Sequence, residues 1–373
     1  MKIVYCVAEL YNAGGIGRII TTKANYLVEK GHEVCLITAE QARRPNFYQL
    51  DSRVKCYDMG INYSENRTIL GKTFAYLSKK KKHEQRLVSL LDLIKPDITI
   101  STMGNEAFFL YKLKDRSKKI LEIHFARNYR LAEKRSFIWN LVDMYRTWQE
   151  DKIIDKYSRF ITLTDEDRKN WIGNNIVTIP NIVNPSKERK ASLMEKRLIA
   201  VGRLVFIKGY DRLIDAWALV YEQCPDWKLD IYGNGNLEEN LKSQIMQLGL
   251  EEVIQIHNPV SNIEEKYVTS SGLILTSSHE GFGLVLVEAM AYGVPVISFA
   301  CPCGPRDIID NNIDGILVTE GDVQGLASAI IKLIKNDVYR KQLGDAAFQK
   351  AHKYSADTVM NKWIQLFEQV LDE

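Results

Sequence analysis

Two glutamates stand eight positions apart in one short stretch, at Glu280 and Glu288. An apolar run at residues 273–276, typical of a buried strand, comes before the first glutamate, and a helical apolar pattern follows from Leu284. We therefore expect the first carboxylate in a strand-to-helix loop and the second on the early turns of the helix. Glycines between them let the backbone approach a ligand closely, and the free N–H groups of a helix N-terminus suit an anion. Phosphate-binding amides beside two hydroxyl-binding carboxylates favour a sugar nucleotide as ligand.

Two basic residues, Arg203 and Lys208, follow another predicted strand at residues 198–201. Loops at the carboxyl ends of strands are where open α/β sheets bind ligands. Arginine offers phosphate a bidentate fork, and lysine offers a point charge. A diphosphate that leaves a sugar gains negative charge, and fixed cations stabilise that transition state. The loop is therefore predicted to bind a diphosphate, although two basic residues in a loop are commonly only solvated.

A glycine-rich turn, Gly14-Gly15-Ile16-Gly17, lies between the first predicted strand and the first predicted helix. This position suits phosphate binding, and it also suits the fingerprint of a dinucleotide-dependent dehydrogenase. The dehydrogenase register needs a glycine at position 20, where this chain has Ile20, so that alternative is disfavoured. Glu40 nevertheless lies just after the second predicted strand, where such an enzyme has a ribose-binding acid.

The order of these motifs resembles a known family. The stretch from Glu280 to Glu288 is similar to the E-x7-E motif of the retaining family-4 glycosyltransferases, which have the GT-B fold. The glycine-rich turn and the basic loop resemble that family's glycine loop and diphosphate clamp, and residues 303–309 and 314–318 resemble its last block. The resemblance covers most of the chain. It implies an α/β protein of the GT-B class, with two Rossmann-like domains facing a cleft.

The resemblance also implies roles for individual residues. Glu288 would accept hydrogen bonds from the ribose hydroxyls, Glu280 would contact the donor sugar, and loops carrying Gly233 and Val260 would hold the base. His124, which ends a predicted strand, would lie near the reacting sugar, whereas we expect Glu122, two residues earlier, to point to the opposite face. The implied catalytic residues are Glu280, His124, Arg203 and Lys208. The implied donor-binding residues are Gly15, Ile16, Gly17, Arg203, Lys208, Gly233, Val260, Glu280, Phe282, Gly283, Leu284 and Glu288, with no metal and no cofactor.

Alternating strand and helix patterns fill both halves of the chain. Predicted strands lie at residues 2–8, 33–38, 97–102, 119–124 and 159–163, and, in a second series, at 198–201, 228–232, 253–257, 273–276 and 294–298. A proline-, asparagine- and charge-rich segment separates the two series. We predict an N-terminal acceptor-binding domain at 1–180, a linker at 181–196, a nucleotide-sugar-binding domain at 197–355, and a helix at 356–373 that, by the resemblance, crosses back to the first domain.

Composition limits the partners and the compartment. The 373 residues are 46% hydrophobic with a net charge of +3, which gives no indication of nucleic-acid binding. Cys6, Cys35 and Cys301 lie in apolar runs, as reduced core cysteines of a cytosolic protein do, and Cys301-Pro302-Cys303 has the wrong spacing for a zinc site. The N-terminal apolar stretch is too short for a signal peptide, and no run approaches the ~20 apolar residues of a membrane span. We expect a cytoplasmic protein, free or peripheral on the inner face of the cell membrane.

Two segments of the first half combine basic and aromatic residues, which suits an anionic membrane surface or a pyrophosphate-linked acceptor. A solvated helix face is the alternative interpretation. The first segment contains Lys72, Phe74, Tyr76, Leu77, Lys79, Lys80, Lys81, Lys82, His83 and Arg86, and the second contains Arg127, Tyr129, Arg130, Lys134, Arg135, Phe137, Trp139, Tyr145, Arg146 and Trp148.

These features predict a retaining glycosyltransferase. It would move a hexose from a nucleotide-diphosphate sugar, with UDP as the expected nucleotide, to a glycan or polyprenyl-linked acceptor in bacterial surface polysaccharide assembly. Three alternatives stay open: an epimerase or a phosphorylase of the same fold, and a non-catalytic sugar-nucleotide-binding protein. An epimerase would lack an acceptor surface, and a phosphorylase would need a cofactor lysine and usually a much longer chain. The intact set of charged site residues disfavours the non-catalytic protein.

Overall fold

Two parallel β-sheets form the centres of two α/β layers. The computed structural model describes residues 1–12, 14–63, 69–127, 129, 137–183 and 190–373, and only the backbone of residues 69–75 and 137–138. A seven-stranded sheet has the order β3-β2-β1-β4-β5-β6-β7, and a six-stranded sheet has the order β10-β9-β8-β11-β12-β13. In both sheets the order reverses beside the first strand of the series, as in Rossmann-like folds. The predicted fold class is confirmed.

The seven-stranded sheet and the helices around it are called the first domain. Its strands alternate with helices because buried parallel strands need crossover connections. Helix α1 ends where Gly31 adopts a φ of 83°, which glycine tolerates without strain. The elements are β1 (Lys2–Val7), α1 (Gly15–Glu29), β2 (Glu33–Thr38), β3 (Lys55–Asp58), α2 (Ile69–Ile94), β4 (Ile98–Ser101), β5 (Lys118–Glu122), α4 (Phe137–Ile154), β6 (Arg159–Thr162), α5 (Asp165–Asn170) and β7 (Ile176–Thr178), with short 3₁₀ turns at Asn105–Phe108 and Leu110–Lys112.

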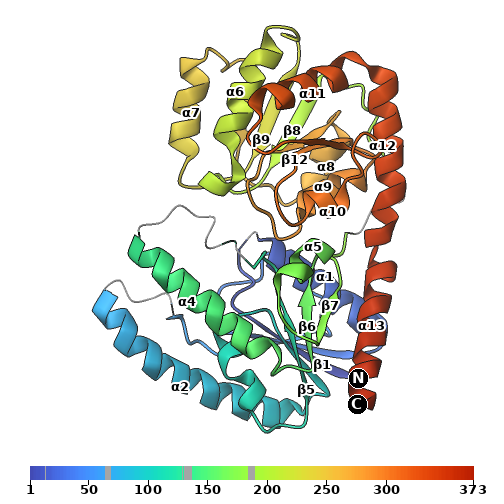
Figure 1. Ribbon diagram of the computed structural model, residues 1–373. Helices are drawn as coiled ribbons and strands as arrows, with labels where there is room; N and C mark the ends of the chain where they lie inside the picture. Colours follow the sequence, from blue (N-terminus) through green and yellow to red (C-terminus); the bar gives the residue numbers. More distant parts are fainter. Residues whose placement is uncertain (13, 64–68, 128, 130–136, 184–189) are drawn as a thin grey trace.

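The six-stranded sheet and its helices are called the second domain. Figure 1 shows it above the first domain, with α6 and α7 on one side and α12 on the other. The elements are β8 (Arg197–Val201), the 3₁₀ turn η4 (Phe206–Lys208), α6 (Tyr210–Tyr221), β9 (Lys228–Tyr232), α7 (Glu238–Gln247), β10 (Ile254–His257), α8 (Ile263–Val268), β11 (Leu273–Leu275), α9 (Leu284–Met290), β12 (Val296–Phe299), α10 (Pro305–Ile308), β13 (Ile316–Val318), α11 (Val323–Lys335) and α12 (Asp337–Ala351).

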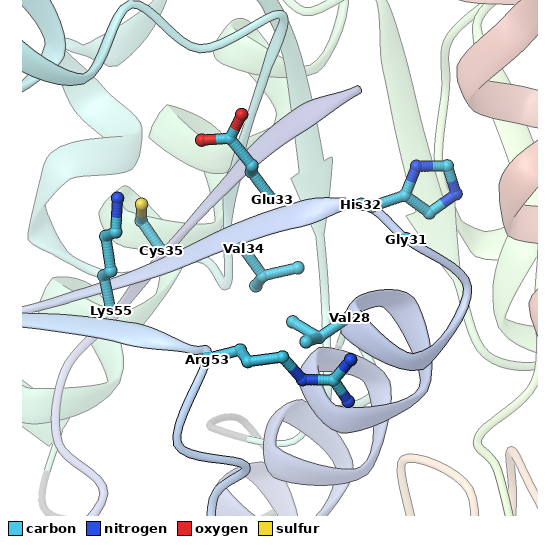
Figure 2. A pocket seen from close by; sticks show the side chains of 8 residues that line it. All are labelled: Val28, Gly31, His32, Glu33, Val34, Cys35, Arg53 and Lys55. Atoms are coloured by element: carbon cyan, nitrogen blue, oxygen red, sulfur yellow. The ribbon is translucent and has the colours of Figure 1, made fainter.

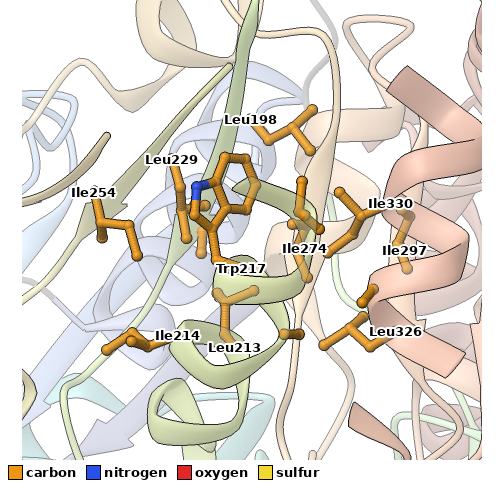
Figure 3. Packing of buried hydrophobic residues seen from close by; sticks show 14 of the residues in the cluster. Leu198, Leu213, Ile214, Trp217, Leu229, Ile254, Ile274, Ile297, Leu326 and Ile330 are labelled. Carbon is orange, nitrogen blue, oxygen red and sulfur yellow. The ribbon is translucent and has the colours of Figure 1, made fainter. Parts of the chain in front are cut away.

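Each sheet buries apolar side chains on both faces. In the second domain, Trp217 of α6 packs with Leu198 and Leu229 of the sheet and with Leu326 and Ile330 of α11 (Figure 3). A separate cluster, which includes Phe282 and Leu286, covers the opposite face. Sheets covered on both faces leave their strand-end loops as the main exposed surface for ligands.

The last helix, α13 (Ala356–Asp372), packs on the first domain after α12 has passed the second domain. Its apolar face, including Val359, Trp363 and Phe367, is buried in the same cluster as Ile3 and Leu27. The two termini consequently lie close together at the end of the first domain in Figure 1. The chain therefore connects the two domains twice, once before β8 and once between α12 and α13.

Most predicted strands appear within one or two residues of their expected limits. Two strands of the first sheet, β3 and β7, have no predicted counterpart. Strand β3 is short and mostly exposed at the sheet edge, so it lacks a clear apolar pattern. Strand β5 ends at Glu122, so the expectation that His124 ends this strand is corrected by two residues.

Candidate functional site

The candidate site lies where the strand order of each sheet reverses. Strand β8 pairs with β9 on one side and with β11 on the other, so the loops after β8 and β11 leave the sheet next to each other. The loop after β8 carries Arg203 and Lys208, and the loop after β11 carries Glu280. A crevice at such a reversal is the usual ligand site of an open α/β sheet.

Lys208 and Glu280, 72 positions apart in the chain, form a direct ion pair. The Lys208 Nζ atom lies 2.6 Å from Glu280 Oε1, and Ser277 Oγ donates to the same oxygen at 2.6 Å. Both charged side chains are largely shielded from solvent, with exposed fractions of 18% and 10%. The structure thus brings together two residues that were predicted to act in one site.

Arg203 belongs to the same loop as Lys208, and its side chain is exposed. No acidic group within the described ranges forms an ion pair with it, so its guanidinium is available to an anion. Its loop is held by close backbone packing against the loop after β9. A Cβ on Gly233 would lie 1.9 Å from the carbonyl oxygen of Gly202, and one on Gly235 would lie 2.3 Å from that of Leu204. Gly233 therefore shapes the site through its lack of a side chain.

The glycine loop of the first domain approaches the start of α9 in the second domain. A Cβ on Gly15 would lie 3.9 Å from Leu284 Cδ2. Gly17 is buried under the loop, whereas the Ile16 side chain is 38% exposed. Gly283 precedes α9 with a φ of 86°, a conformation that favours glycine. The loop and the helix start are therefore neighbours across the two domains.

His124 also meets the second domain. A Cβ on Gly281 would lie 2.8 Å from both the His124 carbonyl oxygen and the Phe125 Cα atom. Phe282, the next residue, is buried with 4% of its surface exposed. The sequence of this loop therefore needs glycine at 281 because the first domain's backbone packs directly against it.

The imidazole of His124 is buried beside an ion pair. Its Nε2 atom lies 3.3 Å from Glu122 Oε1, and the same Glu122 oxygen accepts a hydrogen bond from Lys23 Nζ. Lys23 Nζ also lies 4.0 Å from the centre of the Trp363 ring of α13. Burial lowers the pKa of His124 to about 4, so the imidazole is neutral near pH 7.

The expectation that Glu122 points away from His124 is wrong. Residues two apart in an extended segment lie on the same face, so the two side chains share one side of the sheet. Glu122 and Lys23 are both fully buried, with exposed fractions of 0% and 1%. Burial lowers the pKa of Lys23, while the Glu122 carboxylate opposes that shift.

Glu288 lies on α9 and contacts the first domain. Its Oε1 atom is 2.8 Å from the Arg18 guanidinium, and its Oε2 atom accepts a hydrogen bond of 2.8 Å from Tyr267. Arg18 also pairs with Glu264 of α8. Burial raises the pKa of Glu288, although the Arg18 charge acts against that shift. These side chains, together with Thr22 of α1, line a cavity of about 230 Å³ between the domains.

Sequence reasoning missed Arg18, Glu264 and Tyr267. Their partners lie far away in the chain, and no motif marked them. The one available signal was the position of Arg18, one helical turn beyond Gly15 of the glycine loop. Val260 is partly buried against the apolar cluster that holds Phe282.

A second cavity, of about 260 Å³, lies away from this site. Figure 2 shows its lining at the amino end of β2, with His32, Arg53 and Lys55 around it. The amino ends of parallel strands are not where such sheets bind ligands. We therefore assign no function to this cavity.

The basic segment of α2 differs in part from its prediction. His83 is buried, with Nδ1 3.0 Å from the Tyr63 hydroxyl, and burial lowers its pKa to about 4. It therefore does not belong to a charged surface, which corrects that expectation. Lys81 and Lys82 are exposed as expected. The side chains of Lys72, Phe74, Arg130, Lys134, Arg135 and Phe137 lie outside the described residues.

Comparison with known proteins gives two adjoining family matches. Residues 13–187 match the family described as Glycosyltransferase Family 4, and residues 184–350 match the family described as Glycosyl transferases group 1. The chain belongs to these glycosyltransferases. The resemblance stated from the sequence is thereby confirmed, and the protein is an enzyme of the glycosyltransferase class.

Relatives of similar length support this assignment. An uncharacterised glycosyltransferase of Haemophilus influenzae is 28% identical, with 97% of this chain and 98% of that protein covered. A Campylobacter jejuni enzyme is 25% identical over 99% of both chains; its name describes an N-acetylgalactosaminyltransferase acting on a glycan linked to undecaprenol through pyrophosphate. The pneumococcal O-GlcNAc transferase GtfA, solved with UDP and GlcNAc, superimposes with a TM-score of 0.81 at 16% identity, covering 100% of this chain and 99% of that one. This likeness confirms the GT-B fold of the glycosyltransferase.

No helix in the described residues is long and apolar enough to cross a lipid bilayer.

Proposed function

We propose that this glycosyltransferase moves a hexose from a UDP-sugar to a polyprenyl-linked glycan, with retention of the anomeric configuration, in the assembly of a bacterial surface polysaccharide. The ion pair between Lys208 and Glu280 is the observation that carries the proposal. It sets a cation and a carboxylate suited to sugar hydroxyls side by side at the strand ends, and the loop that carries Lys208 also exposes Arg203.

Each charged group has a separate task in this reaction. The bond between the anomeric carbon and the diphosphate oxygen breaks, and the diphosphate keeps the electron pair. An oxygen of an acceptor hydroxyl forms the new bond to the anomeric carbon, and the proton of that hydroxyl passes to the released diphosphate. Arg203 and Lys208 stabilise the charge that develops on it, which lowers the barrier more than it strengthens ground-state binding. The nucleoside diphosphate is thus the leaving group, and these two cations can serve where other transferases use a metal ion.

Glu280 is proposed to orient the donor sugar. Its Oε1 atom already accepts hydrogen bonds from Lys208 and Ser277. Its Oε2 atom makes no hydrogen bond with a described residue and can accept one from a sugar hydroxyl. A carboxylate held in this way by an ammonium and a hydroxyl group has a fixed orientation, which suits it to positioning a sugar.

His124 and Glu288 are proposed to complete the donor site. Neutral His124 would face the sugar from the first domain, next to Gly281. Glu288 would accept hydrogen bonds from the ribose, since a carboxylate has about four acceptor positions and two are used by Arg18 and Tyr267. Backbone groups of the loops at Gly233 and Val260 would hold the base, and those at residues 282–284 would meet the phosphates.

The acceptor is proposed to approach the outer helices of the first domain. Helix α4 exposes large apolar side chains, including Trp139 (48%), Met144 (58%) and Trp148 (54%). Figure 1 places α4 beside α2, which contributes exposed Leu77 and a run of lysines. Exposed aromatic side chains next to basic ones suit the headgroup region of an anionic membrane, where a polyprenyl-linked acceptor is found. The Campylobacter relative, which acts on such an acceptor, is consistent with this choice.

A two-stage assay tests the proposed function. Thermal unfolding is first measured with UDP-, GDP- and ADP-sugars, and we expect only UDP-sugars to raise the melting temperature, because ligands that bind the folded state stabilise it. The UDP-sugar that raises the melting temperature is then supplied with a radiolabelled sugar, together with bacterial lipid extract. Transfer of label to the lipid phase, with the anomeric configuration retained by NMR, supports the proposal. Conversion of the UDP-sugar into an epimer without any acceptor would instead identify an epimerase.

A further inference from the structure

Two helices from different domains face each other end to end at the candidate site. Gly15, at the start of α1, approaches Leu284, at the start of α9. One turn further along each helix, Arg18 contacts Glu288 at 2.8 Å. Residues three or four apart lie on the same face of a helix, so these two contacts form one continuous strip across the domain interface.

Arg18 contacts two acidic residues of the second domain at once. Its Nη1 atom pairs with Glu288 of α9, and its Nη2 atom pairs with Glu264 of α8. Tyr267 holds the other oxygen of Glu288. The Glu288 carboxylate is only 8% exposed, so without the guanidinium it would be a buried charge with no cation beside it.

We propose that Arg18 is a positioning residue that latches the first domain over a bound nucleoside diphosphate, by fixing the orientation of the Glu288 carboxylate and tying α8 and α9 to α1. This inference rests on the proposed function, in which Glu288 binds the ribose. Opening of the domains would break the latch and leave the buried Glu288 carboxylate without its cation, so binding of the nucleotide and closure of the domains are coupled.

The coupling predicts how much UDP affinity is lost when the ion pairs of Arg18 are broken. Arg18 itself need not touch the nucleotide, because it acts through Glu288. Residues joined by a direct ion pair commonly couple strongly enough to change a dissociation constant about tenfold, which corresponds to ~1.4 kcal/mol. We therefore expect a roughly tenfold or larger loss of UDP affinity when the latch is broken.

A charge swap tests the latch. Arg18→Glu should weaken UDP binding, measured by calorimetry, about tenfold or more and raise the donor KM while changing kcat less. Arg18→Glu combined with Glu264→Arg puts a guanidinium back between two carboxylates. This double variant should recover most of the lost affinity. Arg306→Glu is the matched control, because it breaks a different interdomain ion pair, with Glu166, without touching Glu288.

The outcomes separate the alternatives. Unchanged UDP affinity in Arg18→Glu would overturn the latch, and so would an equal loss in Arg306→Glu, since the effect would then be a general one of interdomain contacts. A swap that recovers nothing would also overturn it, because Arg18 would then act on the nucleotide directly. If the wild type does not bind UDP, the proposed function fails. X-ray scattering still tests the latch in that case. The latch requires a larger radius of gyration for Arg18→Glu than for the wild type, and equal radii of gyration would contradict the latch.

Discussion

Replacing Lys23 by methionine should destabilise the first domain strongly. The change removes a buried ammonium and leaves the Glu122 carboxylate, which is 0% exposed, without its cation. Breaking a buried ion pair in this way costs about 3–5 kcal/mol. For a domain of this size, about 2–4 °C is lost per kcal/mol, so the melting transition should fall by roughly 6–20 °C.

Scanning calorimetry measures the fall in melting temperature, and two further variants show whether the broken ion pair causes it. Lys23→Met combined with Glu122→Met replaces the pair by apolar side chains and should recover much of the loss, because such replacements are often neutral. Lys196→Met removes the lysine of an exposed pair with Asp226 and should leave the transition where it is. A single variant as stable as the wild type would refute the reasoning, and so would a double variant no more stable than the single one.

Four further predictions concern the site and the surface. Glu288→Ala should weaken UDP binding, measured by calorimetry, about tenfold, whereas Glu280→Ala should lower kcat more than UDP affinity. A Glu288→Ala variant that binds UDP as tightly as the wild type would count against the ribose role. The free energy of unfolding should fall as the pH drops from ~6.5 toward 4. His83 and His124 have pKa values of about 4 in the folded protein and near 6.5 in the unfolded chain, so the unfolded chain takes up protons first and is favoured. A free energy of unfolding that stays constant over this pH range, measured by chemical unfolding, would contradict the prediction. Transfer should survive EDTA, and a complete loss that Mg²⁺ or Mn²⁺ restores would show that a metal is needed. The protein should co-sediment with phosphatidylglycerol vesicles in low salt and be released in high salt, more readily after replacement of Lys81 and Lys82 by glutamine; no binding to anionic vesicles at low salt would refute the membrane surface.

The strand-end loops could be predicted because their signals are local. A buried apolar run followed by glycine and charge marks the carboxyl end of a strand, and in a parallel sheet such ends meet on one edge. The sequence pattern alone therefore predicts that Arg203, Lys208 and Glu280 share one site, and their loops do leave neighbouring strands. The short edge strand β3 gave no such signal, since its side chains are mostly exposed and follow no apolar pattern.

Contacts between distant segments could not be predicted in the same way. Lys23 and Glu122 each look like ordinary charged residues, and only the packing of α1 on the sheet buries them together. Arg18 meets Glu264 only because the two domains approach each other. His83 lies in a lysine-rich run of the sequence. Which side of α2 is buried depends on how the helix packs on the rest of the domain, so the burial of His83 could not be predicted.

The most direct test of the central claim is steady-state transfer from a UDP-sugar by Lys208→Ala. Loss of a cation that stabilises the leaving diphosphate should lower kcat about 100-fold or more in a variant that still folds, as checked by circular dichroism. Lys196→Ala, at an exposed ion pair, is the matched control and should retain wild-type kcat. Wild-type kcat in Lys208→Ala would contradict the account, because the pair with Glu280 would then have no part in the reaction.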